Sequence, residues 1–183
     1  MSHEALTADL LRLLTDWSAP SAEQEAIRQE YVAHLGAHEE ATAKGGPPAH
    51  FTASCLVVDT DREHVLLTLH KKVGRWLQFG GHLEETDATI ACGALREALE
   101  ESGLTSAELT LLPGPAQLDR HALGSGFSRC TEHLDLRWIA VAAPGARPVV
   151  SAESEDVAWW PVSALPEDTD SSLRSLVALA AAP

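Results

Sequence analysis

The chain has 183 residues, 45% of them hydrophobic, which is enough for one domain with an extension or at most two small domains. Its 13 Lys and Arg residues face 27 Asp and Glu residues, so the net charge at pH 7 is −14. This charge excludes a protein that wraps an extended nucleic-acid backbone, which normally carries a basic stripe. A small anionic substrate would need local cations or a metal to overturn the global field.

The cysteines Cys55, Cys92 and Cys130 are odd in number, widely spaced and without a CxxC pair. They are typical of reduced thiols rather than of a disulfide framework or a zinc ribbon. The chain shows no basic-then-apolar leader and no apolar stretch of the roughly 18 to 20 residues that span a bilayer. We therefore expect a cytoplasmic protein without a membrane segment.

Two helices are predicted at the amino terminus. Apolar residues recur at three and four residue intervals over residues 4–17, as in an amphipathic helix, and Pro20 ends this pattern. Ser21 and Gln24 resemble a capping box that begins a second helix, which continues to Gly36. We expect these helices to form a hairpin.

A link rich in Gly and Pro, residues 38–49, separates this hairpin from the remainder of the chain. We expect residues 1–49 to be an amino-terminal helical extension and residues 50–183 to be the main domain. Strand patterns in the main domain cover residues 51–58, 64–70, 75–79, 109–112, 117–123, 133–141 and 157–161. Helices are predicted at residues 88–102 and near the carboxyl terminus, so the fold class is α/β.

Three carboxylates define the first candidate site. Glu97, Glu100 and Glu101 stand at i, i+3 and i+4, so they emerge on one face of the predicted helix. Like charges at these spacings repel one another, and a hard cation such as Mg²⁺ removes the repulsion. The alternative is a solvated acidic helix surface, which is what most charge runs are.

The strand before this helix leads into Gly80 and Gly81, which permit a backbone turn where a ligand or metal approaches the main chain. Arg96 lies beside the carboxylates and has two alternative sets of partners. One is Glu100, four residues later; the other is the acidic loop with Glu84, Glu85 and Asp87.

Residues 80–104 resemble the Nudix box, G-x5-E-x7-R-E-U-x-E-E-x-G-U, where U is apolar. The second half matches at every fixed position: Arg96, Glu97, Ala98, Glu100, Glu101, Gly103 and Leu104. The first half has a loop one residue longer, in which Asp87 stands roughly where the family has Glu. The resemblance covers about residues 51–165 and leaves out the amino-terminal helices.

The resemblance implies a Nudix-type α/β/α sandwich with a mixed β-sheet, here with the helical hairpin added. It implies hydrolysis of a nucleoside diphosphate linked to another moiety, by attack of water at phosphorus with Mg²⁺ or Mn²⁺. The substrate would be a small nucleotide: a nucleoside triphosphate, a nucleotide sugar or a dinucleoside polyphosphate. The implied metal ligands are the carbonyl of Gly80 and the side chains of Glu97, Glu100 and Glu101.

The expected catalytic residues are Arg96, Glu100, Glu101 and Glu153. In similar proteins the general base comes from the box or from a later loop, so Glu100 and Glu101 compete with Glu153 for this role. Glu155 and Asp156 are close rivals of Glu153, and each loop carboxylate has a simple alternative as a solvated side chain.

Other polar residues are weaker candidates. Lys71, Lys72 and Arg75 form the densest basic patch and could meet a phosphate tail, or could belong to a solvated hairpin turn. His133 is a candidate for substrate binding because it shares a strand face with Asp135. A zinc site of His121, Cys130 and His133 fits no specific spacing pattern, and hydrogen-bonded strand histidines are the alternative.

Two other functions fit the same fold. A nucleotide-binding regulatory module without turnover is one, although the intact carboxylates of the box argue against it. A Mg-dependent isomerase is the other and would need a reactive thiol, for which Cys55 and Cys92 are the candidates. The segment 124–130 and the amino-terminal helices are candidates for a lid or for the contact of a homodimer.

Overall fold

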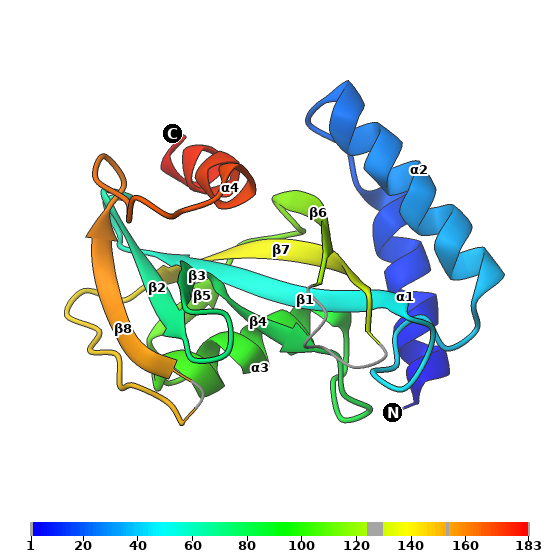
Figure 1. The fold of residues 1–183 in the computed structure, drawn as a ribbon, viewed down its shortest axis with the longest axis horizontal. Coiled ribbons are helices and arrows are strands. Elements are labelled where there is room, and N and C mark those ends of the chain that lie inside the picture. Colours follow the sequence, from blue (N-terminus) through cyan, green and yellow to red (C-terminus); the bar gives the residue numbers. More distant parts are fainter. Residues whose placement is uncertain (1, 124–129, 153, 183) are drawn as a thin grey trace.

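A computed structural model of the chain describes residues 2–123, 130–152 and 154–182. The helices are α1 (His3–Asp16), α2 (Ala22–Ala37), α3 (Ile90–Ser102) and α4 (Ser171–Ala181). The strands are β1 (Ala49–Val58), β2 (His64–His70), β3 (Arg75–Leu77), β4 (Phe79–His82), β5 (Leu109–Leu111), β6 (Gln117–Ala122), β7 (Glu132–Ala142) and β8 (Ser154–Pro161). Figure 1 shows the sheet between α3 and α4, with the α1–α2 pair at one end.

The parallel pair β1 and β7 forms the centre of the sheet, in register from Ala49 opposite Glu132 to Val58 opposite Val141. Strand β1 also pairs antiparallel with β2 and β4, and β7 pairs antiparallel with β5 and β6. Strand β8 extends the sheet beyond β2. The prediction of a mixed sheet in an α/β fold is therefore confirmed.

Both faces of β1 are buried. Phe51, Ala53 and Cys55 belong to the core that α3 covers, whereas Leu56 and Val58 pack in a second core with α4. A strand that is covered on both faces has little polar and apolar alternation, which explains the apolar run from residue 55 to residue 58.

The predicted strand at residues 75–79 is divided in the structure. Strand β3 pairs with β2 and strand β4 pairs with β1, with Gln78 between them. The expected turn at Gly80 and Gly81 is wrong, because both glycines lie within β4 and neither has a positive φ. Packing leaves no room for a side chain at Gly80, because a Cβ there would lie 2.3 Å from the Cβ of Ser54 on β1.

The helical pair α1–α2 packs against the same core as the sheet. Leu6, Leu10 and Leu14 of α1 are completely buried and share a cluster with Phe51 of β1. The hydroxyl of Tyr31 in α2 donates a 2.6 Å hydrogen bond to a main-chain carbonyl of β6. The predicted hairpin is confirmed, and the sheet and these helices bury apolar surface together.

Two side chains connect the hairpin to specific strands and helices. Ser21 accepts a hydrogen bond from the amide of Gln24 and caps α2, as predicted. The Gln24 side chain does not complete a capping box, because it bonds the main-chain NH (2.7 Å) and carbonyl (2.9 Å) of Leu118 instead. Oδ2 of Asp9 in α1 accepts a 2.9 Å hydrogen bond from the main-chain NH of Ile90, so a carboxylate lies at the positive amino-terminal end of α3.

Within the described ranges, no helix is both long enough and apolar enough to cross a membrane.

Replacing Leu10 with Ala tests the contribution of the hairpin to the core. Leu10 is fully buried, so we expect the free energy of unfolding to fall by about 2–5 kcal/mol, measured by urea denaturation. The neighbouring Leu11 is 46% exposed, and Leu11→Ala should change the same quantity by less than about 0.5 kcal/mol. Equal, small effects of both changes would contradict the packing described for α1.

Candidate active site

Helix α3 carries the candidate carboxylates and has well-defined ends. Thr89 caps the amino terminus by accepting the amide of Cys92, in addition to the bond from Ile90 to Asp9. Gly103 ends the helix in the left-handed conformation at φ 68°, as predicted, and its amide donates to the carbonyl of Leu99. A helix fixed at both ends holds its side chains at constant spacing.

The glycines of β4 allow the carboxylates of α3 to approach the main chain closely. The amide of Gly80 donates a 3.0 Å hydrogen bond to Oε1 of Glu101. A Cβ at Gly81 would lie only 2.6 Å from Oε1 of Glu97. The close approach of backbone that the sequence indicated is therefore present, although no turn produces it.

Arg96 is the cation at the centre of this site. Its Nε and Nη2 donate to the two oxygens of Asp87 at 2.9 and 3.1 Å. Its Nη1 donates to Glu97 at 3.0 Å and to Glu100 at 3.1 Å. Its Nη2 also donates to the main-chain carbonyl of His82 at 2.9 Å. Arg96 therefore bonds Glu100 from the first predicted alternative and Asp87 from the second at the same time.

Asp87 is the member of the longer loop that contacts Arg96. It is 4% exposed, and its Oδ2 also accepts the amide of Glu84, whereas the side chains of Glu84 and Glu85 are exposed. Burial opposes the charge on Arg96, but the hydrogen bonds and charges of Asp87 and Glu97 outweigh it and raise the pKa of the guanidinium. Arg96 thus keeps its charge, and its hydrogen bonds to Asp87 orient the loop against α3.

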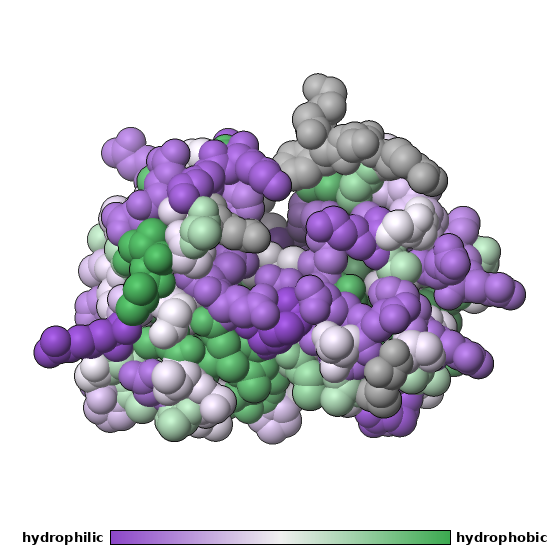
Figure 2. Space-filling model, turned by 90° about the horizontal axis from the view of Figure 1, so that it is seen from below, coloured by the Kyte–Doolittle hydropathy of each residue, from purple (hydrophilic) through white to green (hydrophobic). Residues whose placement is uncertain are grey.

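The residues at this site fit a hard divalent cation. The donors are all oxygens, which Mg²⁺ and Mn²⁺ prefer, and they come from Glu97, Glu100, Glu101 and the carbonyl of Gly80. Glu101 is buried against β4, whereas the Glu100 side chain is 60% exposed. Seen from the side on which α3 lies, hydrophilic residues cover the middle of the molecule (Figure 2).

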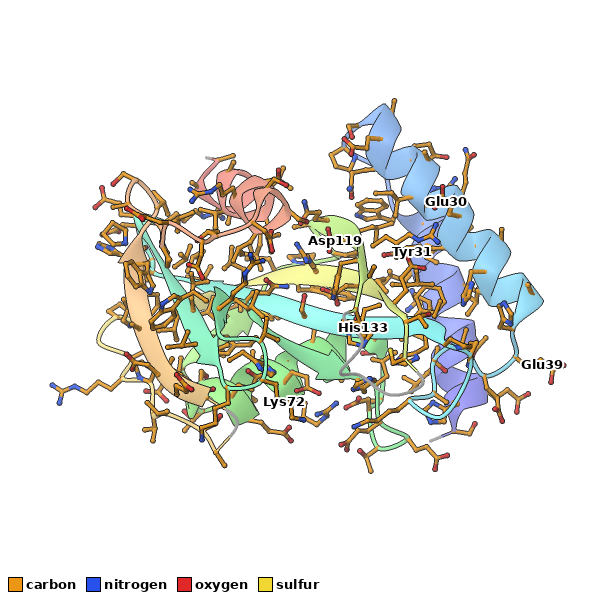
Figure 3. All side chains as sticks on the ribbon, in the orientation of Figure 1. Glu30, Tyr31, Glu39, Lys72, Asp119 and His133 are labelled. Atoms are coloured by element: carbon orange, nitrogen blue, oxygen red, sulfur yellow. The ribbon has the colours of Figure 1, made fainter. Side chains whose placement is uncertain are left out.

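The basic patch lies on the turn between β2 and β3 and on the first residue of β3. Lys71, Lys72 and Arg75 are exposed, and Lys72 is labelled in Figure 3. The Lys71 ammonium donates a 2.6 Å hydrogen bond to the carbonyl of Ala152. Lys71 therefore fixes this loop beside the segment that enters β8.

The predicted general base Glu153 lies outside the described residues, as does most of the segment 124–130. Its rivals Glu155 and Asp156 were expected in a loop, which is wrong, because β8 begins at Ser154 and includes both. Both side chains are exposed. Strand β8 pairs with β2 here, with Asp156 opposite Leu69 and Ser154 opposite His70, and Glu155 lies at the register shift between them.

His133 lies apart from the acidic site, in a group of histidines at the end of the sheet nearest α1 and α2 (Figure 3). Its ring centroid is 5.4 Å from His50, 5.2 Å from His82 and 5.4 Å from His121. Burial is the main cause that lowers the pKa of His133 to about 3 and that of His82 to about 4, so both rings are neutral at pH 7.

The predicted trio of His121, Cys130 and His133 is not the one that the structure assembles. Ligand atoms of His50, Cys130 and His133 lie within 4.8 Å of one another. His121 instead has its Nδ1 2.9 Å from Oδ2 of Asp119. The sequence did not predict His50 as a member of this group, because its proximity to His133 depends on the parallel register of β1 and β7.

A buried polar network on β6 and β7 was also missed. Arg137 donates to Asp135 at 3.1 Å and to Asp119 at 2.7 Å, and Ser172 at the start of α4 bonds both Arg137 and Asp119. Asp119 is labelled in Figure 3. Polar residues at alternate positions 133, 135 and 137 of an otherwise apolar strand were the available signal.

The two thiols considered for an isomerase differ in their surroundings. Cys55 is completely buried, and desolvation raises its pKa well above the usual range, so it is no nucleophile. Cys92 is exposed on α3. Burial therefore removes Cys55 as the thiol of the isomerase alternative and leaves Cys92 as its candidate.

Comparison with known proteins assigns the family. The NUDIX domain matches residues 48–180, which is most of the chain, and the protein therefore belongs to the Nudix family. The match begins just before β1 and so excludes α1 and α2. None of the curated proteins compared with the chain matches it.

Solved structures support the same fold. A NUDIX-family hydrolase from Clostridium perfringens has a TM-score of 0.57 at 23% identity, covering 72% of this chain and 93% of its own. An Ap4A hydrolase from C. elegans has a TM-score of 0.56 at 17% identity, covering 70% and 93%. The dihydroneopterin triphosphate pyrophosphohydrolase of E. coli has a TM-score of 0.53 at 20% identity, covering 71% and 92%.

Replacing Gly81 with Ala tests the close approach of β4 to α3. The new Cβ would displace the flexible Glu97 carboxylate, so we expect weaker Mn²⁺ binding, measured by electron paramagnetic resonance, and a small change in stability. Gly36→Ala, near the end of α2, is the control, because no atom lies within 4 Å of a Cβ there. Unchanged Mn²⁺ binding in Gly81→Ala would contradict the proximity of Glu97 to the metal site.

Replacing Asp119 with Asn tests the buried network through its pH dependence. Burial disfavours the Asp119 carboxylate, but hydrogen bonding to His121 and the charge of Arg137 outweigh it and lower its pKa from 3.8 to about 2. A lowered pKa stabilises the fold above pH 3.8, and this stabilisation of about 2 kcal/mol disappears as the pH falls toward 2. The stability advantage of the wild type over Asp119→Asn, measured by urea denaturation, should shrink over that range.

The control for this experiment is Asp61→Asn, since Asp61 is exposed in the turn between β1 and β2. Its difference from the wild type should stay nearly constant with pH. A constant difference for Asp119→Asn as well would show that Asp119 is not stabilised by this network.

Proposed function

We propose that the protein is a Mg²⁺- or Mn²⁺-dependent pyrophosphohydrolase that cleaves a phosphoanhydride bond in a nucleoside diphosphate linked to another moiety. The observation that carries the proposal is the oxygen cluster on α3: Glu97 and Glu101 meet the main chain of Gly81 and Gly80, and Glu100 faces solvent. Membership of the Nudix family supports the same reaction.

The proposed roles of the residues at this site are metal binding and the orientation of the metal ligands. Glu97, Glu100 and Glu101, with the carbonyl of Gly80, would hold the cation. A bound cation would supply charge neutralisation for the phosphates and activation of the attacking water. Arg96 keeps Glu97 and Glu100 oriented through its hydrogen bonds and is itself fixed by Asp87. This positioning matters because phosphoryl transfer depends mainly on charge neutralisation and in-line geometry.

We propose two further groups for substrate binding and proton transfer. Lys71, Lys72 and Arg75 are cations in a very acidic chain and would neutralise the phosphate tail. Glu153 would act as general base, with Glu100 or Glu101 as the alternative within the helix.

The proposed substrate is a nucleoside triphosphate, a nucleotide sugar or a dinucleoside polyphosphate. Two proteins that share this fold are named for Ap4A and for dihydroneopterin triphosphate, both of which contain phosphoanhydride bonds.

The decisive assay measures phosphate and pyrophosphate release from a panel of nucleoside triphosphates, nucleotide sugars and dinucleoside polyphosphates, with and without Mg²⁺. Glu100→Gln should lower the rate on the best substrate on the order of 100-fold or more, because a charged ligand is lost where negative charge develops. Its melting temperature should change little, because the side chain is mostly exposed.

The matched control is Glu39→Gln, which removes an exposed carboxylate beyond the end of α2, away from α3 (Figure 3). It should leave the rate unchanged. Nucleotide binding without cleavage of any member of the panel would favour the regulatory module, and wild-type rates in Glu100→Gln would remove this residue from the metal site.

A further inference from the structure

Four strands bring their histidines together at one end of the sheet. His50 of β1 stands opposite His133 of β7 in the parallel register, and His121 of β6 stands opposite His133 on the other side. His82 at the end of β4 lies with its ring 5.0 Å from His50. Cys130, just before β7, completes the group with a sulfur atom.

The nitrogen atoms of two of these rings are available as ligands. His50 has its Nδ1 3.1 Å from the carbonyl of Pro47, which fixes the proton on Nδ1 and leaves Nε2 with a free lone pair. That Nε2 is 3.5 Å from the sulfur of Cys130. Nε2 of His133 is buried and has no hydrogen-bond partner among the described residues.

An unpartnered buried nitrogen is costly and calls for an explanation. Ordinary strand histidines satisfy their ring nitrogens, as His121 does with Asp119. A hydrogen bond from the Cys130 thiol to His50 would satisfy that pair but would leave His133 unexplained. An ion bound by His50, Cys130 and His133 would give all three side chains a partner.

The donor set selects the kind of ion. Two imidazoles and a thiolate suit zinc and similar borderline ions, whereas Mg²⁺ prefers oxygen. Three protein ligands leave a fourth tetrahedral position open, as in zinc sites that bind water or a further ligand. A cavity of about 60 Å³ adjoins the group and is lined by Lys44, Gly45, Gly46, Pro47, His50 and Cys130.

We propose that His50, Cys130 and His133 form a second metal site, which binds a zinc-class divalent ion and is separate from the oxygen cluster on α3. Bound there, the ion would join the starts of β1 and β7. His82 lies between the two sites, because its ring contacts His50 and His133 while its carbonyl accepts from Arg96. The proposal does not depend on the proposed hydrolase activity.

The test is a Co²⁺ titration of the full-length, reduced protein after metal removal. We expect one equivalent of Co²⁺ to produce thiolate-to-cobalt charge-transfer absorption and tetrahedral d–d bands, which Zn²⁺ then abolishes by displacement. Cys130→Ser should abolish the charge-transfer absorption, and His133→Gln should weaken Co²⁺ binding by about 10–100-fold or more.

Two controls separate this site from other thiols and from the acidic cluster. Cys92→Ser removes an exposed thiol on α3 and should leave the spectrum unchanged. Glu100→Gln should leave the charge-transfer absorption unchanged, whether or not it alters hydrolysis. The two sites can therefore succeed or fail independently.

A second readout uses the wild-type chain and so does not depend on how a variant folds. Zn²⁺ should slow alkylation of Cys130, followed by mass spectrometry, while leaving alkylation of Cys92 unchanged. The proposal is overturned if Co²⁺ gives no charge-transfer absorption, if that absorption survives in Cys130→Ser, or if Zn²⁺ protects neither thiol.

Discussion

The arrangement of the acidic site depends on the guanidinium of Arg96. Without a cation between them, Glu97, Glu100 and Asp87 would repel one another at the surface of α3. Arg96 donates to all three and to the main-chain carbonyl of His82, so one side chain fixes the loop, the helix and the end of β4. The ion pair of Arg96 with Asp87 is largely buried. Removing one partner of such a pair typically lowers the free energy of unfolding by about 3–5 kcal/mol.

Strand β1 explains why two groups of different chemistry lie close together. It pairs with β4, which presents Gly80 and Gly81 to the carboxylates of α3, and with β7, which presents His133 to His50. The first group offers hard oxygen donors and the second offers nitrogen and sulfur. The two groups therefore suit different ions. His82 contacts both, through its ring on one side and its carbonyl on the other.

The sequence predicted those parts of the molecule that depend on local pattern. The helices, most strands, the Gly103 cap and the shared face of Glu97, Glu100 and Glu101 follow from periodicity and spacing. Contacts set by strand register were not predictable: the His50 and His133 pair depends on the parallel alignment of strands more than 70 residues apart. The turn at the glycines was wrong because β1 supplied a pairing edge, which propensity does not reveal.

We propose that the carboxylates of α3 hold a divalent cation against the main chain of β4. The anomalous diffraction of Mn²⁺ in crystals of the full-length protein tests this directly. We expect a manganese peak bounded by Glu97, Glu100, Glu101 and the carbonyl of Gly80. No peak there at saturating Mn²⁺, or a peak only at His50, Cys130 and His133, would contradict it.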